Sequence, residues 1–208
     1  SPGEDIENLQ QRQVDALFMP QIADIYPQSQ ESDYDVGELG QILCGISRPT
    51  HFKGVAQVVA RFFDIVKPDI AVFGEKDYQQ LTIIRELAKR KYNTIKIASV
   101  PIIREPDGLA MSTRNNYLSV KERARAPLFY KALREAREEL ESGADIALAA
   151  KRALAALSKS FVVDYVEILD ANTLTEITHK SEEIIIISAV RLGGARLIDN
   201  IVFRGANV

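Results

Sequence analysis

Residues 70–80 read IAVFGEKDYQQ, and this stretch decides the fold of the chain. The apolar run at 70–73 predicts a strand of a parallel sheet, buried on both faces. Gly74 follows it directly, and apolar residues then return at helical spacing from Leu81 to Ala88. A strand that passes through a short turn into a helix is the repeating unit of α/β domains.

The same alternation continues on both sides of this stretch. Residues 55–66 carry their apolar side chains on one helical face, and 95–103 read as a second apolar strand. Nearer the N-terminus, 14–18 read as a further buried strand and 28–35 as a polar surface loop. We therefore predict that residues 1–103 form an α/β layer with a parallel sheet.

The pattern changes at Arg104, where a Glu-Pro-Asp-Gly turn follows. Ser119 and Glu122 match a capping box that starts a long helix, and Pro127 predicts either a kink in this helix or a late start of its regular part. This long helix ends at Ser142-Gly143, and an alanine-rich helix then runs to about residue 157. Three strands follow at 161–169, 183–191 and near 196–201, the last of them short. Helices followed by strands predict a small α+β domain over residues 104–208.

Composition excludes several classes of protein. The 208 residues have a net charge of -3, which argues against a nucleic-acid partner held by phosphate neutralisation. No apolar run has the 18 or more residues of a membrane span, because the longest, 184–190, has the length of a strand. The one cysteine, Cys44, cannot form an internal disulfide, which favours a reducing, cytoplasmic compartment.

The turn after residue 73 is the first candidate site. Ligands of open α/β sheets bind beyond the carboxyl ends of the strands, and a helix N-terminus offers unpaired N–H groups to an anion. Lys76 adds a positive charge there, while Asp77 could cap the helix or accept a hydrogen bond from a ribose hydroxyl. The alternative is an ordinary capped helix with a solvated lysine.

Two further polar stretches are candidates. Residues 111–116, MSTRNN, are rich in donors that could hold phosphate oxygens, with Arg114 binding two at once; the alternative is a surface turn. Residues 47–54, SRPTHFKG, could bind a carboxylate or pyrophosphate, although a lone histidine such as His51 is more often structural. Nearby Cys44 is expected to be a buried, inert thiol.

These stretches occur together in an order that resembles the pantothenate synthetase (pantoate–β-alanine ligase) family. The resemblance is carried by SRPTHFKG at 47–54, FGEKDYQQ at 73–80, VP at 100–101, DGLAMSTRN at 107–115 and RLIDN at 196–200. It runs in register along essentially all of the chain, and its GEKD and STRN pieces are the most specific.

The resemblance implies the second half of a nucleotidyltransferase-type Rossmann domain at 1–103, followed by a small domain at 104–208 that closes over ATP. It also implies a ligase that joins pantoate to β-alanine through a pantoyl-adenylate intermediate, with ATP and Mg²⁺, in a homodimer. No protein nucleophile is needed, because the enzyme acts by positioning and by stabilising charge.

The resemblance also assigns roles to residues by position. The ATP-binding residues would be Gly74, Glu75, Lys76, Asp77, Ile103, Met111, Ser112, Thr113 and Arg114. Pantoate would be bound by Gln80 and Arg48. The residues acting on the reacting phosphate would be Lys76, Ser112, Thr113 and Arg114.

The chain departs from the family pattern in two places. The family often has Glu at Cys44 and Gly at Thr50, and its histidine-bearing motif would come before Ser1. We therefore expect an incomplete chain that is weakly active or inactive alone. Two alternatives stay open: a nucleotide-binding or dimerisation module without catalysis, and another adenylate-forming nucleotidyltransferase. The second is disfavoured by the Gln79-Gln80 pair and the 47–54 stretch.

Overall fold

The computed structural model describes residues 2–26 and 34–205, so most of the loop predicted at 28–35 lies outside the described residues. The chain divides into two compact units, Ser1–Asp33 and Tyr34–Val208. Every residue that resemblance placed in the site belongs to the second unit. Among the described residues, none of the helices is both long and apolar enough to span a bilayer.

The first unit contains α1 (Pro2–Gln11) and the single turn α2 (Ile22–Ile25). The strand predicted at 14–18 is wrong, because this segment pairs with no other strand among the described residues. Val14, Leu17 and Phe18 are all exposed. A short apolar run becomes a strand only where a neighbour accepts its backbone hydrogen bonds, and the run itself does not specify that neighbour.

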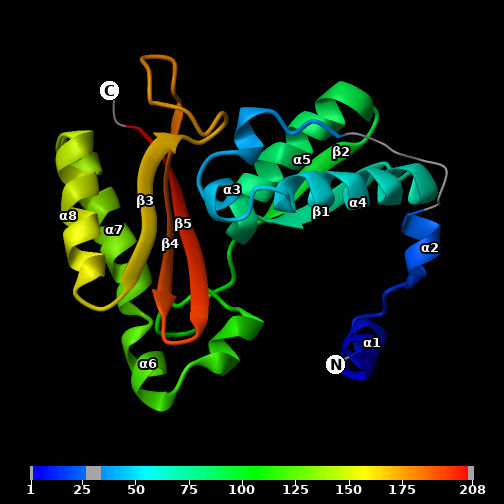
Figure 1. Ribbon diagram of the computed structural model, residues 1–208, viewed down its shortest axis with the longest axis horizontal. Coiled ribbons are helices and arrows are strands. Elements are labelled where there is room, and N and C mark those ends of the chain that lie inside the picture. The colour runs from blue at the N-terminus through cyan, green and yellow to red at the C-terminus, as the bar shows by residue number, and fades with distance from the viewer. Residues whose placement is uncertain (1, 27–33, 206–208) are drawn as a thin grey trace. The chain divides into compact units, whose positions relative to one another are not determined.

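The second unit begins with the predicted α/β alternation (Figure 1). The elements are η1 (Glu38–Gly40), α3 (Cys44–Ser47), α4 (His51–Val66), β1 (Ile70–Gly74), η2 (Glu75–Asp77), α5 (Tyr78–Lys91) and β2 (Lys96–Val100). β1 and β2 are parallel, with Ile70 opposite Lys96 and Gly74 opposite Val100. The predicted strands and helices are confirmed, and the parallel pairing brings the carboxyl ends of both strands to one edge.

The prediction that the first strand is buried on both faces is wrong. Ile70 is 54% exposed and Val72 is 60% exposed, whereas Phe73 packs toward Tyr78 and Leu81 of α5. A parallel strand is buried twice only where elements cover both faces of its sheet. In the described part of the chain, the face that carries Ile70 and Val72 has no such cover.

The rest of the chain forms helices followed by an antiparallel sheet, as predicted. The elements are η3 (Thr113–Tyr117), α6 (Val120–Arg125), α7 (Leu128–Glu141), α8 (Ile146–Ser158), β3 (Val162–Asp170), β4 (Glu183–Leu192) and β5 (Ala195–Arg204). The capping box is confirmed, since Ser119 and Glu122 each bond the backbone N–H of the other. Pro127 separates α6 from α7. The last strand is not short: a Gly193-Gly194 hairpin lets it pair with β4 along ten residues.

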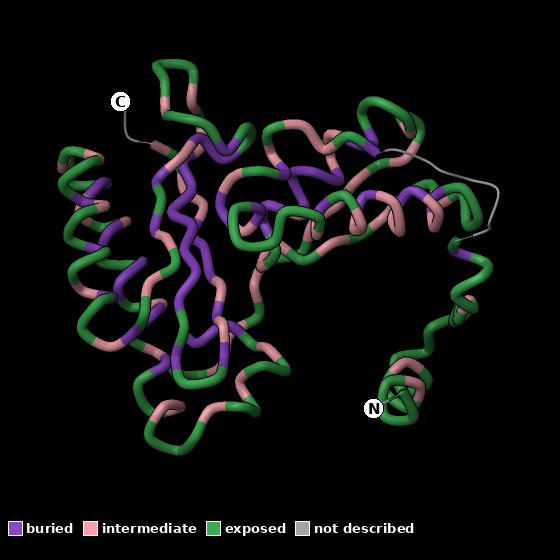
Figure 2. The backbone as a smooth tube through the Cα atoms, viewed as in Figure 1, coloured by how far each residue is buried: buried purple, intermediate pink, exposed green. Residues whose placement is uncertain are grey.

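β4 is the central strand of this sheet and is buried on both faces (Figure 2). Its residues Ile184, Ile186 and Val190 belong to the core formed with α7 and α8. Ile185 and Ile187 point the other way and pack with Tyr78 and Leu81 of α5. This second cluster fastens the α/β part to the antiparallel sheet and positions the site between them. The predicted mixed α/β fold class is confirmed.

Candidate active site

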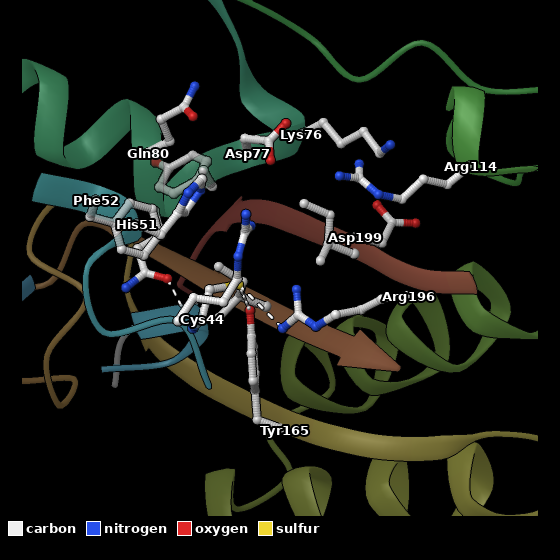
Figure 3. A pocket seen from close by; sticks show the side chains of 15 residues that line it. Cys44, His51, Phe52, Lys76, Asp77, Gln80, Arg114, Tyr165, Arg196 and Asp199 are labelled. Carbon is white, nitrogen blue, oxygen red and sulfur yellow. Dashed lines mark hydrogen bonds between the residues drawn. The ribbon is translucent and has the colours of Figure 1, made fainter. Parts of the chain in front are cut away.

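A pocket of about 170 Å³ lies where the carboxyl end of β1 meets the N-terminus of α4 and the middle of β5. Figure 3 shows side chains of α4, of the turn that follows β1 and of β5 around this pocket. Of the residues that resemblance assigned, five line this pocket: Arg48, Lys76, Asp77, Gln80 and Arg114. They come from three separate stretches of sequence, and folding brings them to one cavity.

The turn from β1 into α5 places two of these side chains. Gly74 ends the strand, η2 makes one tight turn, and Asp77 occupies the N-cap position of α5. The Asp77 side chain makes no capping hydrogen bond with any described residue, so the capping role considered for it is wrong. Its carboxylate instead faces the pocket beside Lys76.

Lys76 occupies a site whose surroundings act on its charge in opposite directions. Burial lowers the pKa of the Lys76 ammonium, and Arg114 lowers it too, while Asp77 and Asp199 raise it. The lysine, Arg114 and Asp199 converge at one end of the pocket (Figure 3). An anionic ligand bound here would raise the pKa of Lys76 again, because a nearby negative charge favours the protonated ammonium.

His51, the first residue of α4, lines the opposite wall. Burial, and then the Arg48 charge, lower the pKa of His51, which the Asp77 carboxylate opposes. Its imidazole is therefore largely neutral at pH 7, so it can donate through one ring nitrogen and accept through the other. That state suits a hydrogen-bonding role better than a fixed positive charge.

The predicted donor-rich loop reaches the pocket only in part. Ser112 is the N-cap of η3 and accepts a hydrogen bond from the Arg114 N–H at 3.2 Å. Ser112 lines a smaller cavity that shares Lys76 and Arg114 with the main pocket. Met111 and Thr113 are not among the described residues that line either cavity, and Met111 is half exposed.

The other assigned residues lie behind or outside the pocket wall. Gly74, Glu75 and Ile103 are not among the described residues that line it, and the Ile103 side chain is 65% exposed. The Glu75 carboxylate accepts a hydrogen bond of 2.7 Å from Ser99 on β2. The structure therefore separates a group of side chains that share the pocket from a group that supports or borders it.

Sequence reasoning missed the wall that the antiparallel sheet contributes. Arg196 on β5 donates to Asp164 of β3 at 2.7 Å and to the Cys44 thiol at 3.4 Å. The same thiol lies 3.1 Å from the Tyr165 hydroxyl. Burial, and then the charge and hydrogen bond of Cys44, raise the pKa of Tyr165. Arg196 belongs to the RLIDN stretch at 196–200 that carries the family resemblance, but the sequence pattern did not indicate that its side chain lines the pocket.

The expectation that Cys44 is a buried thiol is wrong. Its thiol is in contact with a guanidinium and a phenol, and it is only partly buried. These partners come from positions more than a hundred residues away in the chain, which local hydrophobic patterning cannot detect.

The arrangement suits a small anion. Four cationic side chains, those of Arg48, Lys76, Arg114 and Arg196, line the pocket. Among the described residues, no group of three histidine, cysteine or acidic side chains could by itself hold a metal ion. Fold and pocket together define a small-molecule enzyme of the α/β class, with an anion-binding site at a strand-to-helix turn.

Comparison with known proteins agrees with this class. The family model for pantoate-beta-alanine ligase matches residues 1–202. Pantothenate synthetase of Ruthia magnifica subsp. Calyptogena magnifica is 49% identical over 191 residues, which cover 92% of this chain and 69% of the relative. The chain therefore belongs to the pantoate–β-alanine ligase family, as the resemblance implied.

Solved structures give the same answer. Pantothenate synthetase from Thermus thermophilus has a TM-score of 0.90 and 40% sequence identity, over 97% of this chain and 74% of that one. Pantoate-beta-alanine ligase from Francisella tularensis, solved in complex with Beta-gamma ATP and Beta-alanine, has a TM-score of 0.74 and 30% identity. That comparison covers 97% of this chain and 70% of the other.

Proposed function

We propose that this chain carries out the ATP-dependent condensation of pantoate with β-alanine through a pantoyl adenylate, releasing AMP. The observation that carries the proposal is that Lys76, Asp77 and Gln80 line one pocket with Arg48 and Arg114. A ligase of this kind must hold a triphosphate and a carboxylate side by side, and this pocket offers cations to both. The ATP complex of the Francisella relative supports ATP as the nucleotide.

In the first step, a carboxylate oxygen of pantoate attacks the α-phosphorus, and the bond from that phosphorus to the bridging oxygen of pyrophosphate breaks. Negative charge moves onto the leaving pyrophosphate. Lys76 and Arg114 converge at one end of the pocket and would stabilise that charge, with Ser112 and Thr113 as hydroxyl donors of the same loop. Gln80 and Arg48 would orient pantoate.

In the second step, the uncharged amine of β-alanine attacks the acyl carbon of pantoyl adenylate. The C–O bond to AMP breaks, AMP leaves with the electron pair, and the new amide nitrogen loses a proton. The neutral His51 lines the same pocket and is a candidate acceptor of that proton. No side chain becomes covalently attached in either step.

The nucleotide contacts divide between the wall and the rim of the pocket. Asp77 would accept from the ribose hydroxyls, and the backbone of 74–76 would lie along the phosphates. Ile103, which is largely exposed, and Met111, which is half exposed, would border the adenine.

Mg²⁺ fits this site as an ion held mainly by phosphate oxygens and water. Mg²⁺ at nucleotide sites commonly takes only one or two carboxylates from the protein, and Asp77 and Asp199 are acidic side chains that line the pocket with Lys76. When bound, it would neutralise charge on the triphosphate. We also propose that 1–103 and 104–208 act as two domains, and that the protein is a homodimer in the cytoplasm.

The proposal is tested by separating nucleotide binding from turnover. ATP binding to the purified chain is measured by calorimetry, and AMP release is followed with pantoate, β-alanine and Mg-ATP. Each substrate is then omitted in turn. Lys76→Ala is the test variant, and Lys121→Ala, at an exposed position on α6, is the matched control.

Because a weakly active chain is expected, we expect slow AMP release that occurs only when all three substrates are present, and that is lost in Lys76→Ala but not in Lys121→Ala. ATP binding without AMP release under any condition would replace the ligase with a nucleotide-binding module. AMP release that does not depend on pantoate would instead indicate a different adenylate-forming transferase.

A further inference from the structure

Asn200 on β5 makes an unusual contact across the molecule. Its side-chain amide donates to two consecutive backbone carbonyls, that of Glu75 at 2.9 Å and that of Lys76 at 3.2 Å. Asn200 itself is 4% exposed, so water does not compete for these hydrogen bonds. A side chain of the antiparallel sheet thereby holds the backbone of the turn that presents Lys76.

The neighbouring residue acts on the same lysine through charge. Asp199 is 1% exposed, and its carboxylate lies on the Lys76 side of the pocket (Figure 3). The charged groups acting on Lys76 are Asp77 on its own turn, Asp199 on β5 and Arg114 on η3. Of these, the two carboxylates favour the protonated ammonium and the guanidinium opposes it.

Both residues are themselves held in place by Arg104. Its guanidinium donates to the two Asp199 carboxylate oxygens at 2.7 and 2.8 Å and to the Asn200 carbonyl at 3.3 Å. The Asp199 carboxylate also accepts from the Asn200 N–H at 2.8 Å. Tyr130 of α7 lies under the guanidinium, 3.6 Å from the ring centroid. The pair therefore has one well-defined geometry rather than a choice of rotamers.

We propose that Asp199 and Asn200 are positioning residues for Lys76: Asn200 fixes the backbone that carries the lysine, and Asp199 places a carboxylate at the end of the pocket where the lysine side chain lies. This inference rests on the proposed function, because Lys76 is the group that would bind the phosphates. It goes further because it gives two residues of the antiparallel sheet a role in phosphate binding that requires no contact between them and the nucleotide.

The first experiment follows Lys76 itself and needs no ligand. Acetylation of Lys76 by a dilute anhydride is measured by mass spectrometry across a pH series, because only the uncharged amine reacts. Asp199→Asn keeps the shape of the side chain and removes its charge. We expect the reaction at about pH 8 to become roughly tenfold faster, since losing a nearby anion lowers the pKa of an amine.

The second experiment follows the backbone. Hydrogen exchange is measured on peptides that contain residues 74–78 in Asn200→Ala, and ATP affinity is measured in the same preparation. We expect exchange to become about tenfold faster in this segment and ATP binding about tenfold weaker, because two buried hydrogen bonds are lost. Asn200→Ser retains a hydrogen-bond donor and replaces the alanine variant if that variant does not fold. Its exchange rate and ATP affinity should lie between those of the parent and of Asn200→Ala.

Ser188→Ala is the matched control. Ser188 lies opposite Asp199 on β4, is fully buried, and donates to a backbone carbonyl, that of Tyr165. It should leave Lys76 acetylation and exchange at 74–78 unchanged. Equal effects of Ser188→Ala and Asn200→Ala, or unchanged Lys76 acetylation in Asp199→Asn, would overturn the positioning roles.

These outcomes are distinct from failure of the proposed function. If the unmodified chain binds no ATP, the ligase proposal fails, whereas the acetylation and exchange results still decide whether the two residues position Lys76.

Discussion

The ion pair between Arg104 and Asp199 permits a quantitative prediction for the variant Arg104→Met. The pair is bidentate, with N–O distances of 2.7 and 2.8 Å, and the two side chains are 18% and 1% exposed. Arg104 also donates to the Gly108 carbonyl at 3.1 Å. Methionine retains much of the side chain's apolar length, so the variant removes the charge and the hydrogen bonds while leaving most of the packing.

The expected loss of unfolding free energy depends on the interactions that Asp199 would retain in the variant. Removing one partner of a buried ion pair costs about 3–5 kcal/mol, because the remaining charge is left without compensation. Asp199 would still accept from the Asn200 N–H, and Lys76 would still be nearby. We therefore expect the lower end, about 3 kcal/mol, which corresponds to a fall in Tm of roughly 6–12 °C for a chain of this size.

The loss should depend on pH in a defined direction. Burial raises the pKa of Asp199, and Arg104 opposes this, so the folded pKa of the carboxyl rises further in Arg104→Met. A group whose folded pKa lies above its unfolded value stabilises the fold at low pH and loses that contribution as pH rises. The difference between variant and parent should therefore be largest near pH 7 and shrink as pH falls toward about 4.

The assay is urea unfolding followed by circular dichroism at both pH values. Arg104→Met combined with Asp199→Asn should be less destabilised at pH 7 than Arg104→Met alone, because no buried charge is then left unpaired. The control is Arg134→Met, which removes an exposed pair with Glu138 on α7 and should change stability by less than about 0.5 kcal/mol. A loss below about 1 kcal/mol at pH 7, or an equal loss at both pH values, would refute this reasoning.

Three further outcomes are expected. Lys76→Ala should slow pantoate-dependent exchange of pyrophosphate into ATP by about a hundredfold, the effect of losing about 3 kcal/mol of charge stabilisation, and near-normal exchange would remove the role given to it. Burial raises the pKa of Asp164, but two arginines lower it by more, so the folded pKa lies below its usual value. The carboxylate therefore stabilises the fold above the unfolded pKa of about 3.9, and this contribution is lost as pH falls through the folded pKa. Asp164→Asn should flatten the acid limb of a curve of unfolding free energy against pH. The His51 imidazole should titrate below its usual pKa in an NMR pH series, and its pKa should rise when ATP binds, since an added anion favours the charged ring.

Local pattern was sufficient for the elements that carry the site. The strand at β1 and the helix at α5 follow from an apolar run, a glycine and a helical repeat, and Lys76 and Asp77 lie in the turn between them. Such signals survive in a single sequence because each depends only on residues a few positions apart. The polar stretches at 111–116 and 47–54 then indicated Arg114 and Arg48, which line the same pocket in the structure.

Two local inferences failed for one physical reason. The segment at 14–18 and the outer face of β1 are apolar, but burial requires a neighbouring element as well as an apolar side chain. The prediction for Cys44 was wrong for a related reason: the thiol contacts polar side chains of β3 and β5, which are distant in the sequence.

Apart from the segment at 14–18, the sequence alone determined the order of helices and strands, and it also determined the family and three of the stretches that contribute to the pocket. Only the tertiary structure decided that Arg196 and Tyr165 complete its wall, and that Asn200 holds the backbone of Glu75 and Lys76. These are hydrogen bonds and contacts between residues that are far apart in the chain. Their energy depends on distance and burial, which take definite values only once β5 packs against the turn that follows β1.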